Sequence, residues 1–458
     1  MPSLKKIFIT CILLYVTAQV VFFHRIEQPP DLSFDEFFYV PAARQFLVHG
    51  ENENWSQPPL GKLLIASGMA IVGDRPAGWR LMSSVFGSLT LISIYLLCLS
   101  LFRKQKPALF AALLTLFNQL LYVQARIATL DVFMFAFSAF AITSFSYAIR
   151  DSALWSSISK RNHLITLAGA FFGLACACKW FATVPWFACL LLLFFWSLKD
   201  GIQRWARPLL LMSAIPLLFY FLSYLPLVGM QHPYYAPSLK AGDTQITLAE
   251  KTRAVIPPTV DDARPGWRTY PANFPFHDWT YEFFEFLSLQ PKMLRTQLGV
   301  TDKHHPYLSS WYSWPLMLRP IWYHYDQKQL RGVALLGNPV VMWLGLFSVA
   351  FCAIFAIKEQ LFSSIFIFGF YSIFLLSWGL IPRQNTYYYY YYPAGMMLGP
   401  AISFAFNRIR IRPFFVHLLQ LGLLLATIVS FIFFFPVLSS TAMSDSQLNK
   451  RLWLNSWR

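Results

Sequence analysis

Residues 5–23 read KKIFITCILLYVTAQVVFF, two lysines followed by a mostly apolar run. The run is long enough to cross the hydrocarbon core of a bilayer as a helix. No pattern of small residues that a signal peptidase cleaves precedes His24-Arg25, so we expect a retained membrane anchor. Because Lys and Arg near a span stay on the cytoplasmic side, Lys5 and Lys6 predict the direction in which the chain enters the membrane.

The rest of the chain repeats this pattern. Of its 458 residues 56% are hydrophobic and only 13% are charged, a composition that excludes a soluble domain of this size. We therefore expect an all-α integral membrane protein with about eleven transmembrane helices. The expected spans lie near residues 7–23, 81–101, 107–124, 132–149, 164–178, 181–197, 208–228, 335–357, 361–381, 388–406 and 413–436.

Counting spans from a cytoplasmic start places every short basic segment on the cytoplasmic side, as the positive-inside rule requires. An even number of spans would reverse the second half of the chain and break this agreement. The net charge of +16 is explained by these segments and does not require a nucleic-acid partner. The inner cations are Arg103, Lys104, Lys106, Arg150, Lys160, Arg161, Lys199, Arg204, Arg207, Lys358, Arg408, Arg410 and Arg412.

This topology predicts four parts: an N-terminal module of seven spans over 1–228, a large outer loop over 229–334, a four-span module over 335–436, and an outer tail over 437–458. The N-terminal module includes a first outer loop over 24–80. Helical apolar spacing predicts helices that lie along the membrane in both outer loops. We expect them at 35–48, directly after Pro58-Pro59, and at 279–298.

The first outer loop carries an adjacent acid pair, Asp35-Glu36, directly after the first span. Ionisable groups next to hydrocarbon are costly, so such a pair indicates a function. Two carboxylates without nearby His or Cys are poor zinc ligands but suit proton abstraction from a hydroxyl. The pair predicts a catalytic base at the membrane surface. The structural alternative is that it caps an interfacial helix, since acidic residues are favoured at a first helical turn.

Several cations are also predicted on the outer side. Lys62, Arg126, Lys179 and Arg319 lie at the outer ends of spans or in the outer loops. Such a cluster suits a lipid-linked phosphate, for which Arg offers two parallel donors and Lys a point charge. As alternatives, Arg126 forms a structural ion pair with Asp131, and the two lysines extend along apolar surface to reach water.

Three other features have simpler interpretations. All six cysteines lie inside apolar stretches, which indicates membrane packing and argues against disulfide bonds. The run Tyr387–Tyr392 is typical of an aromatic belt at a membrane surface. The neighbouring histidines His304 and His305 have no further ligand at metal spacing, so a divalent metal is not supported, and no cofactor is expected.

These residues together resemble the protein O-mannosyltransferases and their bacterial relatives, the phospholipid-carrier-dependent glycosyltransferases. The resemblance runs from the first span to the last, and its most specific part is the acid pair with the Pro-Pro-Leu-Gly-Lys run at this spacing. The matching runs are Phe34-Asp35-Glu36, Pro58-Pro59-Leu60-Gly61-Lys62, Ala125-Arg126, Leu130-Asp131, Lys179-Trp180, His305-Pro306-Tyr307, Ser309, Trp311-Tyr312-Ser313-Trp314-Pro315-Leu316 and Arg319-Pro320-Ile321-Trp322-Tyr323.

The resemblance implies a fold of the large membrane glycosyltransferase class and an inverting transfer. A mannose-like sugar would move from a polyprenyl-phosphate donor to a Ser or Thr hydroxyl of an exported protein. It implies that Asp35 is the base, that Glu36 positions the acceptor or the base, and that Arg126 holds the donor phosphate, assisted by Lys62, Lys179 and Arg319. The implied location is the bacterial inner (plasma) membrane, with the active site on the periplasmic or extracellular side.

By the same resemblance, the substrate-binding residues are Gln57, Asp131, His305, Tyr307 and Trp311. Family members usually have His where this chain has Gln57, and eukaryotic members have an acid just upstream, where this chain has Trp55-Ser56. The large outer loop has no room for the β-rich domain of the eukaryotic enzymes. The chain therefore resembles the compact bacterial form.

Two other functions fit parts of the sequence. One uses the same donor but a lipid or glycan acceptor, as in the aminoarabinose transferases. The other is a transporter or flippase, which would place charges in the middle of spans. The expected spans are nearly free of such charges, which favours an enzyme whose charges gather at the outer surface.

Overall fold

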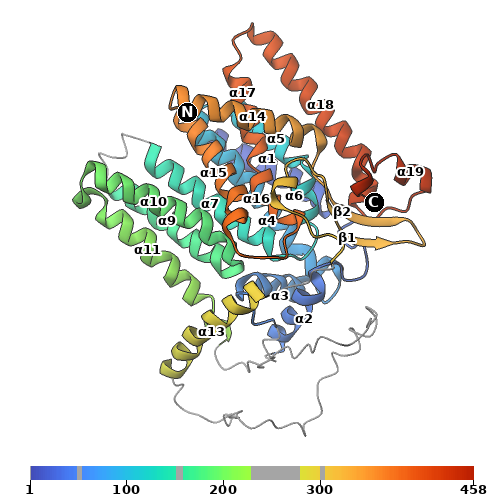
Figure 1. Cartoon of the computed structure of the whole chain (residues 1–458), viewed down its shortest axis with the longest axis horizontal. Helices are drawn as coiled ribbons and strands as arrows, with labels where there is room; N and C mark the ends of the chain where they lie inside the picture. The colour runs from blue at the N-terminus through green and yellow to red at the C-terminus, as the bar shows by residue number, and fades with distance from the viewer. Residues whose placement is uncertain (1, 49–53, 151–157, 228–278, 300–304, 458) are drawn as a thin grey trace.

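The computed structural model describes residues 2–48, 54–150, 158–227, 279–299 and 305–457. Long helices run side by side through most of these residues and form one bundle (Figure 1). Most of the expected outer loop over 229–334, including His304, lies outside the described residues. The all-α membrane architecture is confirmed, apart from one β-hairpin.

Eight segments of the described chain are helical, long and apolar enough to cross a membrane. Six of them are single helices, of which the first five are α1 (Leu4–Phe23), α4 (Pro76–Phe102), α7 (Leu130–Arg150), α14 (Pro339–Lys358) and α15 (Phe362–Leu380). The sixth, α18 (Pro413–Leu438), is among the longest. The other two join a helix to a short 3-10 turn: η1 (Trp180–Ala182) with α10 (Thr183–Asp200), and α11 (Ile202–Leu222) with η2 (Leu225–Leu227).

The three remaining expected spans are interrupted or more polar. The third is divided into α5 (Gln105–Leu116) and α6 (Gln119–Gln124), and the fifth, α9 (Ile158–Cys178), starts with a polar turn. The tenth is divided into η4 (Tyr388–Tyr391), α16 (Tyr392–Gly395) and α17 (Leu398–Arg408). The structure thus confirms a multi-span membrane protein, whereas the count of eleven stays a prediction.

The break between α5 and α6 is compensated inside the protein. The carbonyl of Phe117 accepts a hydrogen bond from the side-chain amide of Asn338 at 3.0 Å, and the same amide donates to Thr427 at 2.9 Å. The side chain of Asn118 accepts from the backbone N–H of Leu120 and caps α6. Because hydrocarbon offers no hydrogen-bond partners, a broken helix at this depth requires such internal partners.

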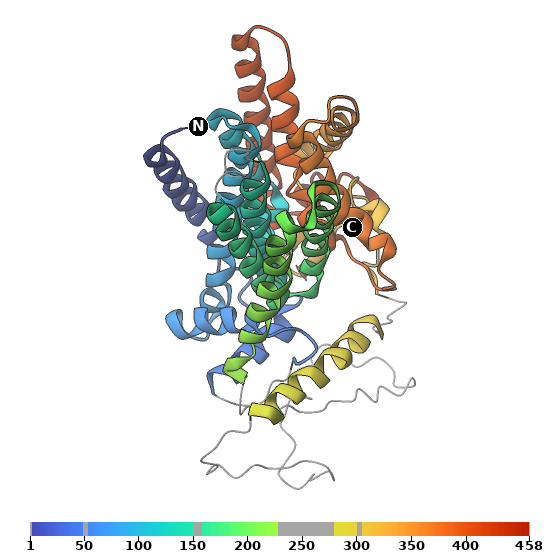
Figure 2. The same cartoon turned by 90° about the vertical axis from the view of Figure 1, so that its left-hand side faces the viewer.

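The expected surface helices are present. They are α2 (Glu36–Leu47), α3 (Leu60–Val72) and α13 (Trp279–Gly299), and all three lie at the same end of the bundle in both views (Figures 1 and 2). Helix α3 begins directly after Pro58-Pro59, as predicted. The amide of Gln297 in α13 donates to the carbonyl of Ser56 at 2.9 Å, which links the two outer segments.

A two-stranded antiparallel hairpin precedes α14, where only irregular structure and a span were expected. Its strands are β1 (Ile321–Asp326) and β2 (Arg331–Leu335), so the span expected from residue 335 begins instead at Pro339. The C-terminal tail, with α19 (Asp445–Asn449) and η5 (Asn455–Trp457), packs back onto this region. The Trp457 indole donates to the carbonyl of Met317 at 2.6 Å, and the Trp457 carbonyl accepts from the Trp322 indole at 3.0 Å.

All six cysteines lie within the described residues, and each is a free thiol. Five of the six are buried. The expectation of membrane packing without disulfide bonds is therefore confirmed.

Candidate active site

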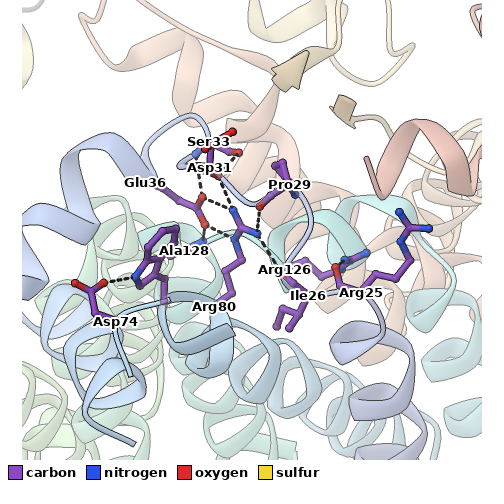
Figure 3. A network of polar contacts seen from close by, with 11 residues as sticks. Arg25, Ile26, Pro29, Asp31, Ser33, Glu36, Asp74, Arg80, Arg126 and Ala128 are labelled. Atoms are coloured by element: carbon purple, nitrogen blue, oxygen red, sulfur yellow. Dashed lines mark hydrogen bonds and ion pairs between the residues drawn. The ribbon is translucent and has the colours of Figure 1, made fainter. Parts of the chain in front are cut away.

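Glu36 forms the centre of a buried polar network at the end of the bundle that carries α2 and α3 (Figure 3). Its carboxylate pairs with Arg80 through two parallel hydrogen bonds of 2.7 Å, and both side chains are fully buried. The backbone N–H groups of Ser33 and Ala128 donate to the same carboxylate, each at 2.9 Å. With four donors, the Glu36 oxygens are saturated, and the carboxylate joins the loop at Ser33 to Arg80 and to Ala128.

Arg80 also fixes the loop that leads to the acid pair. Its guanidinium donates to the carbonyls of Ile26 (3.0 Å), Pro29 (2.8 Å) and Asp31 (3.2 Å) (Figure 3). Sequence reasoning missed Arg80 because it is next to the expected start of the span at residue 81. The acid pair itself was the signal that could have pointed to Arg80, since a buried carboxylate requires a buried cation as its partner.

Asp35 lies outside this ion pair and faces a different set of groups. It occupies the residue before α2, but its side chain makes no capping hydrogen bond, so the helix-cap interpretation of Asp35 is wrong. The hydroxyl of Tyr39 hydrogen-bonds to the Asp35 carboxylate. The pKa of Asp35 is raised to about 6, chiefly by burial. The charge of Lys179 opposes this rise, the charge of Asp131 adds to it, and the Tyr39 hydroxyl and Arg383 also oppose it.

Lys179 and Asp131 form a second buried ion pair next to Asp35. The Lys179 ammonium lies 2.8 and 2.9 Å from the two Asp131 carboxylate oxygens, and both side chains are less than a tenth exposed. The alternative that Asp131 pairs with Arg126 is therefore wrong. The ammonium also lies 5.0 Å from the ring centre of Tyr389 and 5.4 Å from that of Tyr390, so Lys179 does not extend to water.

The tyrosine run forms a wall of this site. Tyr388 to Tyr392 are all buried, so the interpretation as an aromatic belt at the membrane surface is wrong. Tyr390 stacks on Trp378 with ring centres 4.1 Å apart, and its buried hydroxyl has no hydrogen-bond partner. A buried unpaired hydroxyl is costly, so Tyr390 is available to a polar group of a substrate.

Lys62 is fully buried and therefore does not extend to water either. Its ammonium donates to the carbonyl of Gln57 at 2.9 Å and to that of Asn54, and it lies 5.8 Å from the ring centre of Phe46. The structure places Lys62 as a clamp on residues 54–57, the segment that precedes the two prolines. Gln57 contributes its carbonyl to this clamp.

Arg126 differs from the other buried cations of this end. It is 3% exposed and lies next to Arg25 (Figure 3). Its guanidinium donates to the carbonyl of Arg25 and to the Tyr122 hydroxyl. Its Nε has no partner, and no carboxylate of the described residues pairs with it. Arg80 and Lys179 each have a carboxylate partner, and the Lys62 ammonium is held by two backbone carbonyls. Arg126 is therefore the buried guanidinium of this group that is left to bind an anionic ligand.

The predicted residues of the later segment lie around the turn η3 (Trp311–Ser313). The His305 ring packs against Tyr387 with ring centres 4.9 Å apart, and its Nδ1 accepts from the backbone N–H of Tyr307 at 3.3 Å. Arg319 is exposed and donates to the carbonyl of Pro306, within its own segment. Among the described residues, Arg319 contacts neither the Glu36–Arg80 pair nor the Asp131–Lys179 pair.

Two groups therefore meet at one end of the bundle: Asp35 with Asp131 and Lys179, and the Glu36–Arg80 pair with Arg126. The described residues contain no group of three His, Cys, Asp or Glu side chains that could hold a metal ion. At this end of the bundle Asp35 is a partly buried carboxylate with a raised pKa, which suits proton removal from a hydroxyl. Arg126 is a buried cation without a carboxylate partner among the described residues, which suits binding of a phosphate.

Comparison with known proteins identifies relatives along most of the chain. Residues 56–225 match the family model described as dolichyl-phosphate-mannose-protein mannosyltransferase, and residues 282–457 match the model of the C-terminal four TMM region of protein-O-mannosyltransferase. A polyprenol-phosphate-mannose–protein mannosyltransferase of Mycobacterium tuberculosis is 25% identical over 93% of this chain and 86% of the relative. The protein of the same description from Mycolicibacterium smegmatis is 26% identical over 96% of this chain and 91% of the relative.

Solved structures share the fold. The S. cerevisiae protein O-mannosyltransferase complex bound to the sugar donor superposes with a TM-score of 0.79 at 16% identity, covering 100% of this chain and 93% of that chain. ArnT from Cupriavidus metallidurans superposes with a TM-score of 0.55 at 16% identity, covering 91% of this chain and 63% of that chain. The fold and the site define a multi-pass membrane glycosyltransferase. The chain belongs to the protein O-mannosyltransferase family.

Proposed function

We propose that this protein transfers mannose from a polyprenyl-phosphate donor to a Ser or Thr hydroxyl of an exported protein. The observation that carries the proposal is that one end of the bundle holds both a carboxylate with a raised pKa, Asp35, and a buried cation without a carboxylate partner among the described residues, Arg126. The curated relatives named above are polyprenol-phosphate-mannose–protein mannosyltransferases, and the similarity extends over nearly the whole chain.

In this proposal Asp35 acts as general base. Its carboxylate takes the proton of the acceptor hydroxyl while the hydroxyl oxygen attacks the anomeric carbon of the sugar. The bond between that carbon and the phosphate oxygen breaks on the opposite face, so the configuration inverts. The lipid phosphate leaves with the bonding electrons, and the Arg126 guanidinium stabilises its charge.

The neighbouring groups prepare Asp35 for this role. Burial raises its pKa toward the pH at which such an enzyme works, which strengthens it as a base while it remains ionised near neutral pH. Lys179 opposes the rise and keeps the carboxylate from staying protonated. The Glu36–Arg80 pair fixes the loop from Ile26 to Ser33 that leads directly to Asp35.

We place the protein in a bacterial inner membrane with Asp35 on the periplasmic or extracellular side. The support is the distribution of charge along the helices. Helix α9 carries Lys160 and Arg161 at its start and leads to Lys179 of the site at its other end. Basic residues gather at the cytoplasmic ends of spans, so the site lies at the outer ends.

The acceptor class is tested by supplying purified protein with labelled polyprenyl-phosphate mannose and either an unfolded Ser/Thr-rich peptide or a lipid acceptor. We expect label in the peptide. Transfer to the lipid alone would overturn the protein-acceptor assignment and favour a reaction like that of the aminoarabinose transferases. Movement of the donor across a vesicle bilayer without transfer would instead indicate a flippase.

Replacing Arg126 with Gln is expected to raise the KM for the lipid-phosphate donor roughly 10- to 100-fold, the loss of one hydrogen bond to a charged group. The KM for the acceptor peptide should change less than about threefold, because Arg126 is proposed to contact only the phosphate. The matched control is Arg75→Gln, an exposed arginine at the same end that pairs with Glu27 at 3.5 Å. Equal donor KM values for the two variants would remove Arg126 from the phosphate site.

The rate should depend on pH through Asp35. Because its pKa is raised to about 6, kcat/KM should fall below that pH as the base becomes protonated. Lys179→Gln removes a positive charge that lowers the pKa of Asp35, so the acidic limb should move to higher pH. Asp131→Asn removes a negative charge that raises it, so the limb should move to lower pH. If the acidic limb of kcat/KM lies at the same pH in Lys179→Gln and in Asp131→Asn, another group is the base.

A further inference from the structure

A polar pocket lies at the end of α9 that is farthest from Lys179. Its volume is about 300 Å³, and it opens between residues 158–166 of α9 and residues 207–211 of α11. None of its lining residues belongs to the candidate active site. They are Ile158, Ser159, Asn162, His163, Thr166, Arg207 and Leu211.

Asn162 is the unusual member of this lining. Its side chain is 5% exposed, and neither the amide nitrogen nor the amide oxygen has a hydrogen-bond partner. A buried amide without partners is costly, so such a group indicates a missing ligand. The nitrogen can donate to an anionic oxygen and the oxygen can accept from a hydroxyl, so the amide suits a ligand that carries both groups.

The charges around the pocket select an anion. Arg207 and His163 are exposed on its wall, and none of the lining residues that the structure describes is acidic. Lys160 is exposed in the same turn of α9, and the buried Arg161 stacks 5.0 Å from the ring centre of Trp205. Basic residues are expected at the cytoplasmic ends of spans in any case, but that rule does not explain a lined pocket with an unpaired buried amide.

The surroundings favour a lipid over a free ion. Ile158 and Leu211 give the pocket an apolar wall. Beyond it, large apolar side chains are exposed on both helices: Leu167 on α9 is 44% exposed, and Leu210 on α11 is 66% exposed. An exposed apolar surface next to a polar pocket fits acyl chains lying along the helices with the headgroup held at their ends.

The pocket is separate from the donor site. On α9 the pocket centres on Asn162, so the helical rise places it roughly 25 Å from Lys179, most of the thickness of a bilayer core. Between the two, α9 and α11 pack closely: a Cβ added to Gly173 would lie 2.5 Å from the carbonyl oxygen of Pro216. We propose that this pocket binds the headgroup of an anionic phospholipid from the leaflet opposite Asp35, with Arg207 contacting the phosphate and Asn162 the rest of the headgroup.

The test is a titration of the purified full-length protein in detergent with dioctanoyl phosphatidylglycerol, with bound lipid counted by native mass spectrometry. We expect one saturable phosphatidylglycerol, and roughly tenfold weaker binding in Arg207→Gln, the loss of one hydrogen bond to a charged group. The matched control is Arg410→Gln, an exposed arginine of another loop on the same predicted side. Its binding should stay within about twofold of wild type, since it contributes no hydrogen bond to the pocket.

Three results would overturn the proposal. Equal binding by Arg207→Gln and Arg410→Gln would show that the pocket is not the site. Equally tight binding of dioctanoyl phosphatidylcholine would show that the net charge of the headgroup is not recognised. Displacement of the lipid by millimolar inorganic phosphate would assign the pocket to a free ion. Because Arg207 is exposed, its replacement is compatible with folding, and Asn162→Leu serves as a second variant that fills the pocket.

Discussion

Replacing Asp35 with Asn is expected to lower the rate of mannosyl transfer by about three to four orders of magnitude, the upper range for loss of a positioned general base. Asn has the same size but cannot accept the proton of the acceptor hydroxyl. The measurement is the transfer of labelled mannose from polyprenyl-phosphate mannose to an acceptor peptide at pH 8, where the wild-type carboxylate is ionised. A rate within tenfold of wild type would remove Asp35 from this role.

The same variant should remain folded. The pKa of Asp35 is raised in the folded protein from 3.8 to about 6, so ionisation costs stability as the pH rises through 6, and this cost is absent below about pH 4. Asn carries no charge and removes that cost. The melting temperature of Asp35→Asn at pH 8 should therefore equal or exceed that of wild type. A lower melting temperature would indicate that the lost rate reflects a damaged fold.

Breaking the buried pair between Glu36 and Arg80 should have the largest effect on stability. Arg80→Met removes the guanidinium and leaves a fully buried carboxylate without its cation, which is expected to cost ~3–5 kcal/mol. The loop carbonyls of Ile26 and Pro29 lose their donor at the same time. The measurement is the melting temperature in detergent, together with the fraction of protein recovered as a monodisperse peak.

The matched control is Arg44→Met. Arg44 pairs with Asp74 at 2.7 Å, the same distance, but both side chains are more than two fifths exposed. An exposed pair is worth ~0–1 kcal/mol, so this variant should melt close to wild type. A similar loss in Arg44→Met and Arg80→Met would show that burial of the Glu36–Arg80 pair is not what makes it important.

The double variant Glu36→Leu with Arg80→Met separates pairing from packing. With both charges gone, no uncompensated charge remains buried, so the double variant should be more stable than Arg80→Met alone. It should still transfer mannose slowly, because the loop that leads to Asp35 has lost its anchor. If the double variant is less stable than Arg80→Met, the remaining partners of the Glu36 carboxylate are sufficient to stabilise its charge without Arg80.

Much of the fold followed from the sequence because hydrocarbon imposes simple rules on composition and charge. Long apolar runs such as 76–102 can only be buried helices or spans, and Lys5-Lys6 predicts their direction. The surface helices were predictable from Pro58-Pro59 and from helical apolar spacing. The acid pair was predictable as a functional site because ionisable groups next to hydrocarbon cost free energy and are retained where they are used.

Partners in space were not predictable. Sequence gave no way to assign Asp131 to Lys179 instead of Arg126, since 47 residues and a helical hairpin separate the true partners. The tyrosine run has the composition of a membrane-surface belt, yet Tyr390 is buried beside Lys179. Composition does not show which face of a segment is covered by other helices, and the hairpin over 321–335 was missed for the same reason.

The central claim is that Asp35 performs chemistry while Arg126 binds the donor. The most direct test is the equilibrium dissociation constant of polyprenyl-phosphate mannose measured on Asp35→Asn and on Arg126→Gln. We expect Asp35→Asn to bind the donor within about twofold of wild type while transferring almost none of it, and Arg126→Gln to bind it roughly 10- to 100-fold more weakly. Weak binding by Asp35→Asn together with tight binding by Arg126→Gln would contradict the assignment of both residues.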